Sequence, residues 1–206
     1  MEYQTQTSDR FKFLAVLDFE ATCAEEHEAW NLNLQEIIEF PVQLIDLETK
    51  RKISMFHTMV RPVRQPKLTS FCTELTSIAQ TQLIHQPTIE EVMDHFGRWC
   101  AEYQVNAQNT CVATCGDWDL RVMWPKQVRL APLLKTPALF KRWCNLKVIF
   151  KRYTQCKAKG MMSLLQYANI PHQGRHHRGI DDVNNLSEFV VWALEQGWAF
   201  YPTHYH

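Results

Sequence analysis

Two carboxylates lie close together at the end of an apolar run. The run FKFLAVLDFE, residues 11–20, is typical of a buried strand and ends in Asp18 and Glu20. Side chains two residues apart share one face of a strand, so these carboxylates converge, and burying them is costly unless a cation neutralises them. Their oxygen atoms favour Mg²⁺ or Mn²⁺ over zinc. For this pair alone, a strand that simply ends in water stays an open alternative.

A second acidic pair follows another apolar run. TCVAT, residues 110–114, predicts a short central strand, and Asp117 and Asp119 come directly after it in the run GDWDL. Ligands of α/β proteins bind where such strands end. One aspartate can cap the following helix while the other binds a metal ion, and the spacing does not choose between them.

A third group of polar residues precedes the last helix, in the run HHRGIDD, residues 176–182. Helical spacing places Asp182 above the apolar stripe of that helix and turns Asp181 toward solvent. Asp182 is therefore a helix cap or, if Asp18 and Glu20 reach the same point, a third metal ligand. His177 would then lie over the site as a general base, whereas His176 is expected on the surface.

The elements that must position these groups are strands followed by helices. We expect an antiparallel hairpin (40–47 and 53–60), helices at 74–86, 90–103, 162–170 and 180–198, and a capping box of Thr88 and Glu91. This order predicts an α/β fold in which a mixed sheet, an antiparallel hairpin plus parallel strands, is flanked by helices. We expect one domain over residues 10–200, a flexible segment at 1–9 and a tail at 201–206.

Composition and charge narrow the class of protein. The 206 residues are 46% hydrophobic and 21% charged, which excludes a disordered, collagen-like or coiled-coil chain. Residues 120–180 carry 13 Lys and Arg and no acidic residue, whereas residues 1–119 carry 9 Lys and Arg against 18 Asp and Glu. This segregation favours a polyanionic partner such as nucleic acid and pairing with the acidic first half about equally.

The sequence also indicates the cellular compartment of the protein. The first residues do not resemble a secretory signal, and seven scattered cysteines favour reduced thiols. We therefore expect a cytoplasmic or nuclear protein without a membrane span.

The quoted motifs together resemble a known family. DFEATC, EIIEFPV, SFCTELTSIAQ, GDWDL and GRHHRGIDD are similar to motifs of the DEDDh branch of the DnaQ-like 3′-5′ exonucleases. Within that branch they resemble the enhanced-RNAi/histone-mRNA exonuclease subfamily, which includes Snipper and the prion-protein-interacting exonuclease. The resemblance covers roughly residues 10–200 and implies an RNase H-like fold.

The resemblance also implies a mechanism and a site. Asp18, Glu20, Asp119 and Asp182 would hold two Mg²⁺ or Mn²⁺ ions, with His177 as general base. The implied activity is release of nucleoside 5′-monophosphates from RNA or DNA 3′ ends by a monomer. The implied substrate-binding residues are Phe19, Ala21, Phe71, Leu75, Thr76, Trp118 and Arg178. Two alternatives stay open, a non-catalytic nucleic-acid-binding adaptor on the same fold and a DNA proofreading or repair exonuclease.

Overall fold

A mixed sheet forms the centre of the molecule. The computed structural model describes residues 11–25 and 30–205. Their sheet has the strand order β2-β3-β1-β5-β6-β7, with β4 paired to β3 beside this path. The strands are β1 (Phe13–Leu17), β2 (Glu20–Ala21), β3 (Ile37–Asp46), β4 (Arg51–Met59), β5 (Thr110–Thr114), β6 (Arg142–Asn145) and β7 (His204–Tyr205).

The pairing confirms the predicted combination of an antiparallel hairpin and parallel strands. Strand β3 is antiparallel to β1 and β4, whereas β5 is parallel to β1 and β6. Every residue of β1 and β5 is buried, which explains why both read as continuous apolar runs rather than alternating ones. The carboxyl ends of β1 and β5 therefore meet at one edge of the sheet.

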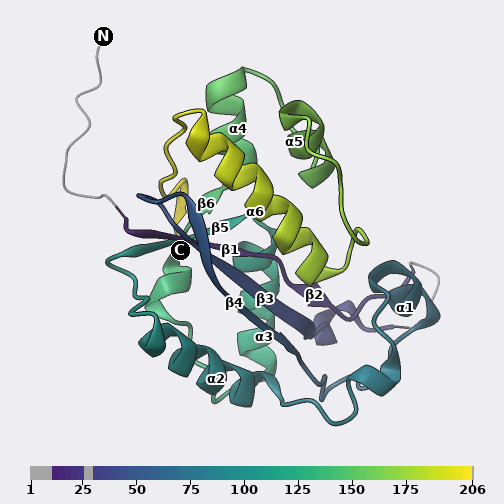
Figure 1. Cartoon of the computed structure of the whole chain (residues 1–206). Helices are drawn as coiled ribbons and strands as arrows, with labels where there is room; N and C mark the ends of the chain where they lie inside the picture. The colour runs from purple at the N-terminus through teal and green to yellow at the C-terminus, as the bar shows by residue number, and fades with distance from the viewer. Residues whose placement is uncertain (1–10, 26–29, 206) are drawn as a thin grey trace.

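Helices cover both faces of the sheet, as Figure 1 shows, with α2 and α3 on one face and α4, α5 and α6 on the other. A separate apolar core lies under each face. The helices are α1 (Ser70–Thr76), α2 (Ile89–Glu102), α3 (Trp124–Leu130), α4 (Leu146–Thr154), α5 (Met161–Ala168) and α6 (Gly179–Glu195). Short helical turns are η1 (Leu32–Leu34), η2 (Gln80–Gln82), the π-helical η3 (Trp118–Met123) and η4 (Ala138–Lys141).

The first predicted helix is wrong in its bounds. The expected helix over 74–86 is instead α1 followed by η2. Thr69 starts α1 early, because its hydroxyl accepts a hydrogen bond from the Cys72 backbone amide at 2.9 Å. Ser77 ends it in the left-handed conformation at φ 58°. The capping box of Thr88 and Glu91 is confirmed, and α2 begins directly after it.

The C-terminal end of the chain joins the central sheet. The predicted flexible segment 1–9 lies outside the described residues. The predicted tail reaches the sheet, because β7 pairs with β6 in the register Trp143 with His204. Among the described residues, no helix has the length and apolar character needed to cross a bilayer.

Candidate active site

Three acidic side chains from distant parts of the chain meet at the carboxyl end of β1. Asp18 follows β1, Glu20 begins β2, and Asp182 lies in the first turn of α6. One carboxylate oxygen from each lies within 4.8 Å of the others. Glu20 and Asp182 are 9% and 4% exposed, and Asp18 is half-buried. The predicted convergence of Asp18 with Glu20, and of both with Asp182, is present in the structure.

Asp119 reaches the same place from the end of β5. It lies in η3 and is 5% exposed, and its Oδ1 accepts a 2.8 Å hydrogen bond from the backbone amide of Phe19. That amide belongs to the peptide between Asp18 and Phe19, so Asp119 lies beside the carboxylate cluster. The spacing left Asp117 and Asp119 as alternatives and the resemblance pointed to Asp119; in the structure Asp119 lies beside the cluster, whereas Asp117 binds a different set of partners.

Burial raises the pKa of all four carboxylates, and repulsion by neighbouring acids adds to this rise for Asp18 and Glu20. Burial, followed by the charge of Asp119, raises the pKa of Asp18 well above its usual value. Burial, followed by the charge of Asp182, raises the pKa of Glu20 to about 9. Burial raises the pKa of Asp119 to about 6, although the Phe19 amide opposes this rise. The pKa of Asp182 is raised, again chiefly by burial. The charges that add to the rise for Asp18 and Glu20 come from neighbouring acidic groups, whereas His176 and His177 lower the pKa of Asp182.

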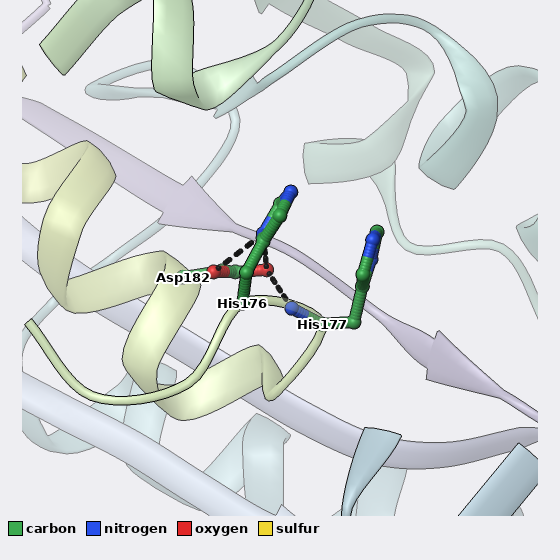
Figure 2. A group of neighbouring side chains, drawn as sticks. All are labelled: His176, His177 and Asp182. Atoms are coloured by element: carbon green, nitrogen blue, oxygen red, sulfur yellow. Dashed lines mark hydrogen bonds and ion pairs between the residues drawn. The ribbon is translucent and has the colours of Figure 1, made fainter. Parts of the chain in front are cut away.

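Two adjacent histidines lie over Asp182 (Figure 2). The Nδ1 atom of His176 is 3.2 and 3.1 Å from the two carboxylate oxygens of Asp182, and the His177 backbone amide donates to Oδ2 at 2.9 Å. The expectation that His176 is only a surface residue was therefore incomplete: its side chain is 43% exposed but contacts a site carboxylate. Burial, followed by the charge of His176, lowers the pKa of His177, which keeps its ring neutral at neutral pH.

A buried glutamate that sequence reasoning missed joins α6 to the sheet. Glu39 of β3 is fully buried and pairs across the strands with Glu20. Its carboxylate accepts from the Gly179 amide at 2.9 Å and lies 3.2 Å from Nε of Arg178 and 2.8 Å from Nε2 of His57. The signal available in the sequence was an acidic residue inside the apolar run IIEFPV, which predicts a paired charge.

The start of α6 packs closely against the sheet at Gly179. A Cβ atom there would lie 3.1 Å from the backbone oxygen of Asp18 and 3.2 Å from Oε2 of Glu39. The first turn of α6 can therefore approach β1 and β3 closely enough to deliver Asp182.

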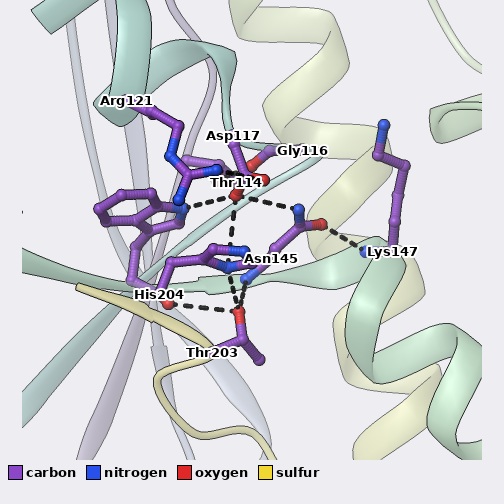
Figure 3. A network of polar contacts seen from close by, with 9 residues as sticks. Thr114, Gly116, Asp117, Arg121, Asn145, Lys147, Thr203 and His204 are labelled. Atoms are coloured by element: carbon purple, nitrogen blue, oxygen red, sulfur yellow. Dashed lines mark hydrogen bonds and ion pairs between the residues drawn. The ribbon is translucent and has the colours of Figure 1, made fainter. Parts of the chain in front are cut away.

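A second polar network holds the loop that carries Asp119 (Figure 3). Oδ1 of Asp117 accepts hydrogen bonds of 3.0 Å from Nε1 of Trp143 and from Nδ2 of Asn145, and His204 Nδ1 lies 3.4 Å away. The ring of His204 stacks on Trp143 with centroids 5.5 Å apart. Asp117 thus ties the loop after β5 to β6 and to the C-terminal strand β7.

Comparison with known proteins identifies the family. The family model described as "RNase_T: Exonuclease" matches residues 15–189. The chain belongs to this exonuclease family. It is 37% identical over 197 residues to "ERI1 exoribonuclease 3" of Homo sapiens, covering 94% of this chain and 57% of that protein, so it spans little more than half the length of this relative. It is 30% identical to "3'-5' exoribonuclease 1" of Mus musculus over 91% of this chain and 54% of that protein.

Solved structures of exonucleases share the fold. The nuclease domain of 3'hExo, described as a DEDDh family member bound to rAMP, superposes with a TM-score of 0.88 at 27% identity, covering 95% of this chain and 98% of that one. Cell-death related nuclease 4 has the same fold, with a TM-score of 0.84 at 23% identity over 93% of this chain and 67% of that one. The predicted RNase H-like exonuclease fold and the resemblance to the DEDDh exonucleases are confirmed.

The structure places the substrate-binding residues predicted for an exonuclease in different environments. Phe71 and Leu75 are half-buried on α1, and Trp118 is 39% exposed beside Asp119. Phe19 is 3% exposed and packs against Phe40 with ring centroids 4.8 Å apart, so that its backbone is the part that borders the site.

The remaining predicted contacts are more enclosed. Ala21 is 5% exposed, and Thr76 is fully buried with its hydroxyl donating to the Cys72 carbonyl at 2.8 Å. The Arg178 side chain is 17% exposed and pairs with Glu39. Thr76 and Arg178 therefore have structural partners of their own.

Proposed function

We propose that this protein is a divalent-metal-dependent 3′-5′ exoribonuclease that releases nucleoside 5′-monophosphates. The observation that carries the proposal is the convergence of the Asp18, Glu20 and Asp182 oxygens within 4.8 Å, with Asp119 beside them, in a chain of the exonuclease family. The exoribonuclease names of its relatives support RNA as the substrate class.

The donor set fits Mg²⁺ or Mn²⁺. The four acidic residues offer only oxygen atoms, which are the preferred ligands of these hard cations. The raised pKa values of Asp18 and Glu20 point the same way, because a cation between the carboxylates would relieve the repulsion that favours their protonated forms. When bound, the ions would supply activation of a water molecule and stabilisation of the leaving 3′ oxygen.

The protein's own groups would handle the proton and the nucleotide. The neutral His177 ring, on the loop before α6, would accept the proton from the attacking water. Trp118 and Phe71 would stack on the terminal bases, a contact that every base can make. The basic segment 120–180 would bind phosphates upstream of the 3′ end, which makes binding salt-sensitive and largely independent of sequence.

One degradation assay tests this proposal. RNA and DNA strands of one sequence, 5′-labelled and presented as 3′ overhangs, are incubated with Mg²⁺ or Mn²⁺. We expect a ladder that shortens from the 3′ end, faster for RNA, and none after chelation of the metal. Asp18→Asn is the matched control for a contaminating nuclease.

The same assay separates the alternatives. A labelled strand that is shifted in a native gel but keeps its length would contradict the proposal in favour of an adaptor. A clear preference for the DNA strand would instead favour a proofreading or repair exonuclease.

A further inference from the structure

Asp182 belongs to two different groups of metal-ligating side chains. With Asp18 and Glu20 it forms the oxygen cluster of the proposed nuclease site. With His176 and His177 it forms a second group, in which one ligand atom from each residue again lies within 4.8 Å of the others. The nuclease proposal gives His176 no role.

The second group has the ligand chemistry of a transition-metal site. Two imidazole nitrogens and a carboxylate oxygen suit Zn²⁺ and similar ions, whereas Mg²⁺ prefers oxygen ligands. Three protein ligands leave one tetrahedral position for water, as in other three-ligand zinc sites. The two clusters therefore differ in metal preference although they share a carboxylate.

One pair of ligand atoms already has the spacing of such a site. The His176 Nδ1 atom lies 3.1 Å from Asp182 Oδ2, close to the roughly 3.3 Å separation of ligand atoms in tetrahedral zinc. The His176 and His177 rings are stacked, with centroids 4.0 Å apart and planes at 18° (Figure 2). Both residues are exposed, so an ion from solvent can reach them. Stacked rings direct their nitrogen lone pairs along nearly parallel planes, so the His177 ring must turn before both rings bind one ion.

We propose that His176, His177 and Asp182 form an inhibitory zinc site. Zinc bound there would engage the imidazole needed as a base and would withdraw Asp182 from the oxygen cluster. The inhibitory consequence rests on the proposed nuclease function, whereas zinc binding itself does not.

Direct metal titration tests the binding. Untagged, metal-free protein is titrated with ZnCl₂ against a chromophoric chelator, with and without Mg²⁺, because the two ions compete for the shared Asp182. We expect one zinc ion per chain, and His176→Ala should weaken its affinity by at least about tenfold, a loss that even outer-shell partners of a metal can cause. Replacing an exposed histidine of α2, His95→Ala, should leave the affinity unchanged.

Cobalt and a second variant complete the binding test. Co²⁺ should give the strong visible absorption of a tetrahedral complex in the wild type and in His95→Ala but not in His176→Ala. His176→Gln retains a hydrogen-bond donor toward Asp182 but is a poor zinc ligand, so it should behave like His176→Ala even if alanine loosens the loop. Equal zinc affinity in the wild type and in both His176 variants would overturn the proposed site.

Inhibition is measured separately. Each variant's Mn²⁺-supported rate is normalised to its own zinc-free value, and zinc should inhibit His176→Ala only at concentrations about tenfold or more above those needed for the wild type. If zinc binds in a His176-dependent way but does not inhibit the nuclease, the zinc site stands and its inhibitory role is rejected. A protein without nuclease activity would still give the binding result, so the two failures are distinguishable.

Discussion

The site carboxylates and the carboxylates that support them differ in how their charge is compensated. Asp18 and Glu20 face other acids, and burial and repulsion raise the pKa of each. Glu39 and Asp117 instead accept hydrogen bonds or ion pairs from neighbouring donors. Glu39 has Gly179, Arg178 and His57, while Asp117 has Trp143, Asn145 and His204.

This difference distinguishes the carboxylates that position parts of the site from those that would bind a metal ion. The paired carboxylates fix two parts of the site, the first turn of α6 and the loop after β5, against the sheet. That scaffold holds Asp18 and Glu20 at short separation, so a bound cation rather than a protein group would compensate their charge. The fold thus supplies the positive partners of Glu39 and Asp117, and we expect metal ions to supply those of the site.

The largest expected effect comes from removing one unpaired carboxylate. Asp18→Asn should lower the exonuclease rate by about a thousandfold, because a metal ligand contributes several kcal/mol to the transition state, here about 4 kcal/mol. The same change should raise the melting temperature of the metal-free protein, since it removes repulsion. Rate assays and thermal melts check both effects, and a lower melting temperature would contradict the comparison.

Removing a paired carboxylate should instead lower the stability of the protein. Glu39→Ala leaves Arg178 without its partner and should destabilise the protein by about 3 kcal/mol, the lower end of the cost of breaking a buried ion pair. Chemical denaturation measures this loss. Glu39→Gln, which retains an acceptor for the Gly179 amide, should restore part of the stability and of the affinity for Mn²⁺. Equal stability and equal Mn²⁺ affinity of Glu39→Ala and Glu39→Gln would show that Glu39 does not position α6.

Loss of the Asp117 network should have a smaller effect on stability than loss of Glu39. Asp117→Ala removes the hydrogen bonds that Asp117 accepts from Trp143 and Asn145 and should cost about 2 kcal/mol, within the range for hydrogen bonds to a charged group. The exonuclease rate should fall with the substrate KM nearly unchanged if the loop misplaces Asp119 rather than Trp118. Asp117→Asn is the control that retains one acceptor oxygen. A rise in KM alone would assign the network to substrate binding.

The smallest effect expected is a pH dependence of metal stabilisation. The pKa of Glu20 rises from 4.5 to about 9 on folding, so the folded state binds the proton more tightly than the unfolded state. Stability of the metal-free protein should therefore fall as pH rises across that interval. Mn²⁺ must displace this proton, so its increase in melting temperature should be larger at about pH 8.5 than at about pH 6. Glu20→Gln should flatten the difference.

Much of the fold could be predicted from local patterns. The buried run that forms β1, the hairpin of β3 and β4 and the apolar stripe of α6 each follow from periodicity, and the capping box fixes the start of α2. The first helix was misplaced because a side-chain cap at Thr69 and a left-handed Ser77 set its ends, neither of which periodicity reveals.

The sequence by itself determined which carboxylates share a face and where the helices carry their apolar stripes, because these depend on geometry within a few residues. Only the tertiary structure shows how Asp119, which local spacing did not distinguish from Asp117, reaches the site: through a hydrogen bond that joins residues 100 positions apart. It also decided that Glu39 binds α6 and that His176 contacts Asp182. The reason is physical: a buried charge needs a partner, and which partner it finds depends on how the elements pack.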